Sequence, residues 1–204
     1  DLKFGRYDTE LTDEGHNQAY EVGNKISLYL QENDYKLTNT VIISSPFART
    51  LQTAGQVSRG LDSKLPIFIE NGLAEHLNPK WYHIPPEEFL VCMINKETNE
   101  KKCYLEAMKE HEVILKSQTP LPSHPETHEE CYQRLKEAYN KIIPYYFRTL
   151  DYDVMIMVTH FLPLEYFMKM FYDGEIKLPV EYCLTYSFTY SENSLNFLEK
   201  FYPI

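Results

Sequence analysis

Arginine, histidine and glutamate side chains follow three short apolar runs in this sequence, and together they have the chemistry needed to handle a phosphate group. Arg49, His160 and Glu75 each come shortly after such a run (40–45, 154–158 and 66–69, respectively). A guanidinium binds a phosphate through two parallel hydrogen bonds, and an imidazole exchanges its proton near neutral pH. A carboxyl group acts as a general acid where a pocket raises its pKa.

The ends of these runs decide whether the three side chains meet. In an open α/β sheet, ligands bind at the carboxyl ends of the parallel strands, where helix N-termini also favour anions. Ser44-Ser45-Pro46 ends the first run, and Pro46 suits the first position of a helix, which places Arg49 about one turn inside it. We therefore expect Arg49 and His160 to converge on one site.

Each residue also has an ordinary structural interpretation. Taken alone, Arg49 fits a surface strand–helix turn, His160 fits a buried histidine that caps a turn, and Glu75 fits a solvated loop. Their shared position after predicted strands favours the site over these alternatives.

Other signatures of chemistry are weak or absent. His124 and His128 have the HxxxH spacing of metal ligands, but Pro125 lies between them and no third ligand is evident. The sequence has no GxSxG elbow, no Walker loop, no GxGxxG after a strand and no HExxH. We expect neither a metal nor a cofactor.

Helical and strand-like segments alternate along most of the chain, which predicts an α/β fold. Apolar residues recur at helical spacing from about 12 to 32, with Thr12 or Asp13 as N-cap, and over about 126–148, where Pro144 is expected to kink or end the helix. Further helices are predicted over 46–60 and 162–172, and a closing hairpin over 184–190 and 195–201. These segments predict three layers, helix–sheet–helix, around a mostly parallel central sheet.

Residues 71–125 are less regular than the rest. We predict two short helices there, roughly 86–94 and 104–117, bracketed by Trp81, Pro85-Pro86 and Pro120-Leu121-Pro122. This pattern indicates a lid or insertion at about 76–125 over a cleft. We expect residues 1–204 to form a single domain.

The bulk composition excludes several classes of protein. The 204 residues carry a formal net charge of −10, which argues against binding to nucleic acid. No apolar run approaches the length of a membrane span. The four cysteines show no CxxC pair or regular spacing, so we expect reduced thiols and a cytoplasmic protein.

The same residues resemble the motifs of the histidine phosphatase superfamily, also called phosphoglycerate-mutase-like, over nearly the whole chain. The second-strand motif of that family is similar to Ser44-Ser45-Pro46 with Arg49 and Gln52-Thr53-Ala54. Four further segments resemble it: Asp8–Thr12 with Gly15, Gln18-Ala19 and Gly23; Glu70–Glu75; Glu126 with Arg134; and Val158-Thr159-His160. The region around Trp81-Tyr82 looks most like the branch of ubiquitin-associated and SH3-domain phosphatases and ecdysteroid-phosphate phosphatases.

The resemblance implies a phosphoglycerate-mutase-like fold and a phosphatase that works through a phosphohistidine. In this family a histidine in an Arg-His-Gly motif attacks the phosphoryl group, arginines and a second histidine hold its oxygens, and a carboxyl group protonates the leaving group. Arg49 and His160 would supply part of the phosphate cradle and Glu75 the proton. The implied substrate is a phosphorylated small molecule or a phosphoprotein, and no metal is implied.

The sequence departs from the family at the nucleophile. It contains no Arg-His-Gly, and neither Arg6 nor His16 follows a strand. Because the sequence begins with Asp1 rather than Met, we expect the nucleophile and its strand to lie in a further N-terminal segment. Two alternatives stay open: an inactive relative that serves as a scaffold or interaction subunit, and a sugar-phosphate mutase.

Overall fold

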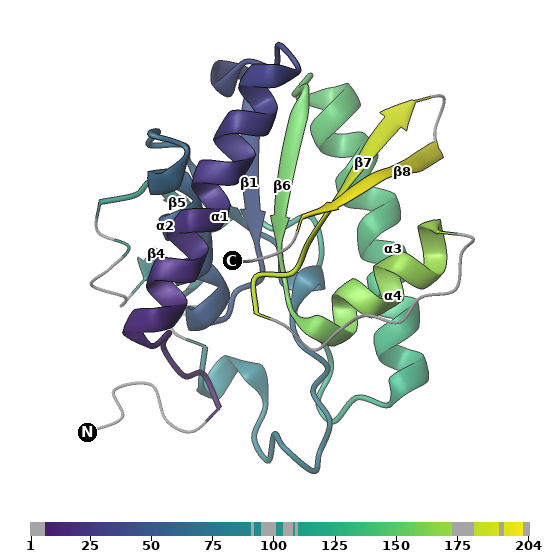
Figure 1. The fold of residues 1–204 in the computed structure, drawn as a ribbon. Helices are drawn as coiled ribbons and strands as arrows, with labels where there is room; N and C mark the ends of the chain where they lie inside the picture. The colour runs from purple at the N-terminus through teal and green to yellow at the C-terminus, as the bar shows by residue number, and fades with distance from the viewer. Residues whose placement is uncertain are drawn as a thin grey trace.

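A parallel β-sheet with helices on both faces forms the body of the protein (Figure 1). The computed structural model describes residues 7–90, 92–94, 101–103, 108, 110–172, 182–191 and 194–201. Four strands form the sheet in the order β5 (Val113–Ile114), β2 (Ile67–Ile69), β1 (Thr40–Ser44) and β6 (Val154–Val158). All neighbours in it run parallel, with Ile42 opposite both Ile67 and Ile156. The expected parallel sheet is confirmed.

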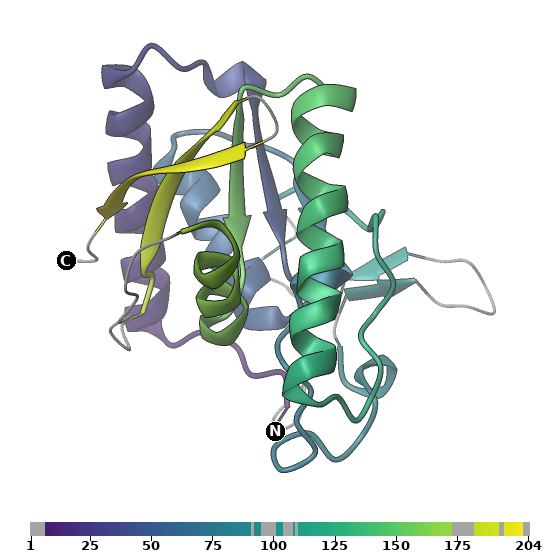
Figure 2. The ribbon, with the colours of Figure 1, turned by 90° about the vertical axis from the view of Figure 1, so that its right-hand side faces the viewer.

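Two pairs of helices cover the sheet, one pair on each face (Figure 2). The helices are α1 (Asp13–Glu32), α2 (Ala48–Gly60), α3 (His128–Pro144) and α4 (Phe161–Phe171). Side chains of β1 alternate between the two layers: Ile42 packs with α1 and α2, whereas Val41 and Ile43 pack with α3 and α4. The predicted three-layer α/β architecture is therefore confirmed.

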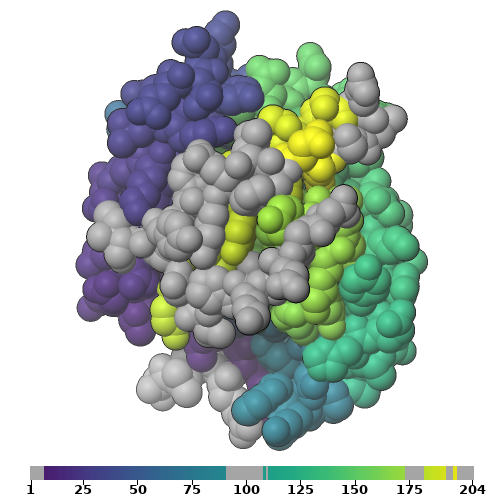
Figure 3. All heavy atoms as spheres, turned by 45° about the vertical axis from the view of Figure 1, so that its right-hand side comes forward, coloured from purple at the N-terminus to yellow at the C-terminus, as the bar shows by residue number. Residues whose placement is uncertain are grey.

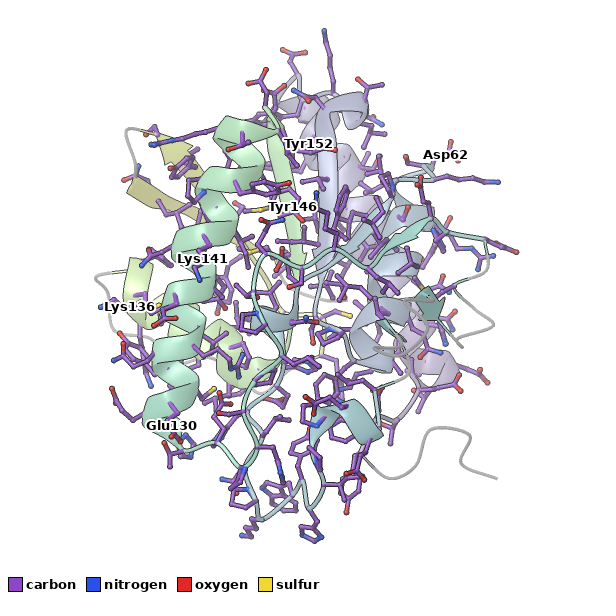
Figure 4. All side chains as sticks on the ribbon, turned by 180° about the vertical axis from the view of Figure 1, so that it is seen from behind. Asp62, Glu130, Lys136, Lys141, Tyr146 and Tyr152 are labelled. Carbon is purple, nitrogen blue, oxygen red and sulfur yellow. The ribbon has the colours of Figure 1, made fainter. Side chains whose placement is uncertain are left out.

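The helix α3 has one buried apolar face and one exposed polar face, as the helical spacing of its apolar residues predicts. Its apolar side chains, including Leu135 and Ile142, are fully buried, whereas Lys136 and Lys141 lie on its outer side (Figure 4). Its α-helical part ends at Pro144, as expected, and the chain continues through a π-helical turn, Tyr145–Thr149.

Local residues cap the N-termini of α1 and α3, whereas a residue distant in the sequence caps the N-terminus of α2. The Thr12 hydroxyl accepts from Gly15 N–H at 3.1 Å, as predicted for an N-cap, and Thr127 caps α3. The prediction that Pro46 opens α2 is wrong, because that helix begins at Ala48. Its first N–H donates to the carboxylate of buried Asp8 at 2.6 Å, so a residue 40 positions away supplies the cap.

The irregular region contains strands where helices were predicted. Pro86–Glu88 forms one 3₁₀ turn, after which β3 (Cys92–Ile94) pairs with β4 (Lys101–Cys103) as an antiparallel ribbon. The predicted helix over 104–117 is also wrong where it is described, since Val113–Ile114 is the edge strand β5. The predicted hairpin is confirmed as β7 (Thr185–Ser191) and β8 (Ser194–Phe201), which form a separate two-stranded sheet.

Close packing of α1 against α2 generates a prediction about stability. A methyl group on Gly23 would collide with the carbonyl oxygen of Val57 and lie 2.9 Å from the Cα of Gly60. Because rigid backbone lines this contact, we expect Gly23→Ala to lower the free energy of unfolding by about 1–3 kcal/mol. Urea denaturation measures the change.

Gly15→Ala is the matched control in the same helix. A methyl group there would meet no atom closer than 3.4 Å. It should leave stability unchanged or raise it by up to about 1 kcal/mol, because alanine is the better helix former. Equal unfolding midpoints for the two variants would contradict this account of the α1–α2 contact.

Candidate active site

Three loops bring Arg49, His160 and Glu75 together at the carboxyl edge of the sheet. Arg49 lies in the first turn of α2, His160 is the N-cap residue of α4, and Glu75 follows β2 and a 3₁₀ turn, Asn71–Leu73. An Arg49 Nη2 atom lies 3.0 Å from His160 Nδ1 and 3.9 Å from Glu75 Oε2. His160 Nδ1 lies 3.7 Å from the same carboxylate oxygen. All three predicted residues thus face one point.

The contacts of His160 define its protonation state. The Arg49 guanidinium has only donors, so His160 Nδ1 must accept from it. The proton of the neutral ring therefore sits on Nε2, which donates to Ser45 Oγ at 2.7 Å. Burial, followed by the charges of Arg49 and Arg134, holds the pKa of His160 well below its usual value. The ring is a neutral imidazole before any anion binds.

Glu75 has the opposite shift. Burial raises the pKa of Glu75, even though the His76 N–H and the charge of Arg49 favour the carboxylate. The His76 N–H donates to Glu75 Oε1 at 3.0 Å. A raised pKa increases the protonated fraction near neutral pH, which suits a general acid.

Exposure differs among the three side chains. Arg49 and Glu75 are 27% and 23% exposed, whereas His160 is 3% exposed. The Arg49 guanidinium also lies over the Phe47 ring, 4.6 Å from its centroid. A ligand from solvent would therefore meet Arg49 and Glu75 first, with His160 behind them.

The motif search missed two contributors to the site. Ser45 lies in the Ser44-Ser45-Pro46 motif, but the motif assigns it no role in the site, and the structure shows that it contacts the His160 ring. Tyr82 comes from the irregular region and is buried, and burial raises the pKa of its hydroxyl while the nearby charge of Arg49 opposes that shift. The Tyr82 ring packs edge-on to Phe47 and stacks on Phe89, with centroids 6.0 and 5.7 Å apart. No spacing in the sequence marks Tyr82, because tertiary packing alone brings it to Arg49.

A large cavity leads from this site along β6. Its volume is about 890 Å³, and residues of α1, α2, β6 and β7 line it, with Arg49, Glu75 and His160 also on its wall. In Figure 3, atoms of β7 lie between those of α1 and those of α4 on this side of the molecule. Within the described ranges, β6 pairs only with β1, and its Met155–Met157 segment is only partly buried.

The two histidines with metal-ligand spacing contact other residues of the same chain. His124 Nε2 donates to the Tyr82 carbonyl at 2.8 Å, and His128 Nδ1 lies 3.0 Å from the Tyr166 hydroxyl. Over the residues that the structure describes, no group of three or more His, Cys, Asp or Glu could hold a metal ion. In the same part of the chain, no helix combines the length and apolar character of a membrane span.

Two of the four cysteines have described side chains, and both carry free thiols. Cys131 is buried in α3 and Cys183 precedes β7. Burial raises the pKa of Cys131 to about 12, which makes its thiol unreactive near neutral pH.

Comparison with known families agrees with this geometry. Residues 2–199 match the model of the histidine phosphatase superfamily (branch 1), and the chain belongs to this superfamily. The resemblance seen in the motifs is therefore confirmed at the level of the superfamily. A search of curated proteins found no significant match.

Two solved structures resemble the chain at low sequence identity. The ecdysone phosphate phosphatase of Bombyx mori, solved with tungstate, is 20% identical, with a TM-score of 0.44 over 86% of this chain. A mycobacterial glucosyl-3-phosphoglycerate phosphatase is 16% identical, with a TM-score of 0.49 over 95% of this chain and 88% of its own length. The chain spans 62% of the length of the silkworm protein.

The contacts of His160 predict its behaviour in solution. Because its pKa is held well below 6.5, we expect the ring to stay neutral, with the proton on Nε2, from pH 8 down to pH 6.5. Two-dimensional ¹H–¹⁵N NMR of the imidazole measures both the charge and the tautomer, and His160→Gln assigns the signal. A titration midpoint at or above 6.5, or a proton on Nδ1, would refute this description.

Proposed function

We propose that this protein hydrolyses phosphate monoesters through a phosphohistidine, and that this chain supplies the phosphate cradle and the general acid. The observation that carries the proposal is the meeting of Arg49, His160 and Glu75 within 4 Å of one another at the carboxyl edge of the sheet. Membership of the histidine phosphatase superfamily supports the same reaction class.

Arg49 and His160 would bind the phosphoryl oxygens. Arg49 is partly exposed, and its guanidinium has five N–H donors in a planar fork, which suits a bidentate contact to phosphate. An approaching phosphate dianion favours the protonated form of His160, because an opposite charge within about 4–6 Å stabilises the cation. Protonated at Nδ1, His160 would donate to a phosphate oxygen, so both residues stabilise charge in the transition state.

Glu75 would handle the proton of the leaving group. As the bond from the nucleophilic histidine to phosphorus forms, the bond to the ester oxygen breaks and that oxygen takes the Glu75 proton. Water then attacks the phosphohistidine and gives its proton to the Glu75 carboxylate. Inorganic phosphate leaves, and the nucleophile and the acid return to their starting states.

We place the nucleophile on a strand that this sequence does not contain. The cavity beside β6 supports this assignment, because it has a mostly apolar lining and includes β6, which pairs only with β1 in the part of the chain that the structure describes. A strand added there parallel to β6 would end at the same edge of the sheet as Arg49 and His160. Its last residues would then face the cradle.

The substrate is proposed to be a phosphorylated small molecule or a phosphoprotein. Residues 76–125 would act as a lid at the mouth of the site, a role supported by the packing of Tyr82 against Phe47, the ring over which the Arg49 guanidinium lies. The lid belongs to the same domain as the sheet in this proposal, since β5 comes from it and pairs with β2.

Substitution of the cradle tests the proposal in protein purified with its native N-terminal residues. We expect Arg49→Ala and His160→Ala each to lower kcat/KM for nitrophenyl phosphate by at least ~100-fold, because each removes a preorganised electrostatic donor. Arg59→Ala is the matched control: this arginine is also on α2, is half exposed and pairs with Glu110 at 2.9 Å. If both cradle variants keep wild-type turnover, the site assignment is wrong.

The raised pKa of Glu75 predicts the sign of the pH dependence. Glu75 acts in its protonated form, so kcat/KM for an alkyl phosphate should fall as pH rises through a pKa above 4.5. In Glu75→Gln this fall should disappear, and turnover should be low at every pH. The measurement is a pH profile of kcat/KM.

A complete lack of turnover would refute the enzymatic proposal. Protein with its native N-terminus that hydrolyses no phosphate ester between pH 4 and 8 would instead favour the scaffold or interaction subunit. Stable co-purification in a complex would then be the supporting result.

A further inference from the structure

A buried arginine, Arg134 of α3, lies behind the loop that carries Glu75. Its guanidinium binds the Glu126 carboxylate through two hydrogen bonds, Nε to Oε1 at 2.6 Å and Nη2 to Oε2 at 2.9 Å. Glu126 is 2% exposed, and the Arg134 side chain is 14% exposed. This bidentate pairing fixes the plane of the guanidinium and leaves its other donors aimed at the loop.

Those donors hold the backbone of the Glu75 loop. Arg134 Nη1 donates to the Gly72 carbonyl at 2.8 Å and to the Ala74 carbonyl at 3.3 Å. Arg134 Nη2 donates to the Ala74 carbonyl at 3.3 Å and to the Glu75 carbonyl at 3.4 Å. One side chain therefore binds three backbone carbonyls within the four residues that end at Glu75.

The other side of the loop is held independently. Gly72 N–H donates to Thr119 Oγ1 at 2.7 Å, and Asn71 N–H donates to Ser117 Oγ at 2.9 Å. Ser117 Oγ in turn donates to buried Glu70 at 2.8 Å. These bonds fix the start of the loop, whereas its end is held by Arg134 and by the Thr159 hydroxyl, which donates to the Leu73 carbonyl at 2.8 Å.

We propose that Arg134 is a positioning residue, which holds the Glu75 carboxyl at the site by binding the backbone of residues 72–75. The proposal rests on the proposed function, because it assigns Arg134 a role through the general acid. In the described part of the chain, the Arg134 side chain hydrogen-bonds to the loop carbonyls and not to the Glu75 carboxylate or to His160, so it acts through the loop. Its charge additionally favours the Glu75 carboxylate and the neutral His160 ring.

The variant Arg134→Lys separates geometry from charge. Lysine keeps the positive charge, but its ammonium group cannot bind Glu126 in a bidentate manner and also reach the loop carbonyls. Arg59→Lys is the control, since Arg59 lies on the exposed face of α2 and pairs only with Glu110. If Arg134→Lys does not fold, Glu126→Gln tests the same contact, because an amide cannot accept both guanidinium bonds.

The leaving group provides a readout that a merely structural role would not move. An alkoxide needs the Glu75 proton, whereas nitrophenolate leaves as a stable anion. We expect Arg134→Lys to lower kcat for an alkyl phosphate by about 10- to 100-fold, as for a misplaced catalytic group, and kcat for nitrophenyl phosphate far less. Equal losses on both substrates, or no loss, would overturn the positioning role while leaving the proposed function intact.

Hydrogen exchange tests the anchoring without turnover. The Ala74 N–H donates to the Asn71 carbonyl, and the His76 N–H donates to the Glu75 carboxylate. We expect both amides to exchange at least ~10-fold faster in Arg134→Lys, with amides of β1 unchanged. Unchanged exchange at 74 and 76 would refute the anchoring. An inactive wild-type protein would refute the proposed function alone, and this measurement would still decide the contact.

Discussion

Backbone hydrogen bonds at the ends of three parallel strands are the constraint on which the site depends. Ser45 N–H donates to the Val158 carbonyl at 2.9 Å, and Glu70 N–H donates to the Ser44 carbonyl at 2.8 Å. These two bonds continue the ladders of β1 with β6 and with β2 past the last paired residues. The loops after the strands therefore leave the sheet side by side, and side chains more than 80 residues apart meet without a long connection.

Burial shifts the pKa values of two groups in this site, His160 downward and Glu75 upward. The protein has a net charge of −10, yet Arg49 and Arg134 dominate the potential around His160. Burial keeps His160 neutral and favours the protonated form of Glu75. The site without a ligand therefore contains the Arg49 cation beside a neutral imidazole and a carboxyl group that favours its protonated form. Binding of an anion and uptake of a proton are coupled in such a site.

The parts of the structure that could be predicted from the sequence are those governed by local or periodic signals. The four long helices, β1, β2, β6 and the terminal hairpin follow from apolar spacing, and Thr12 follows from capping chemistry. The short strands β3 and β5 were missed, since two or three residues carry no period and gain their conformation from remote partners. The same reason applies to Asp8 and Tyr82, whose roles arise only when distant segments pack.

The edge of β6 that faces away from β1 has a consequence for folding and for association between molecules. Within the described residues, β6 pairs only with β1, and a strand paired on one side presents N–H and C=O groups that lack a neighbouring strand; partly buried methionines accompany them here. Such an edge is a template for any extended chain, including a second copy of itself. While this edge is uncovered during folding, association between molecules therefore competes with correct folding.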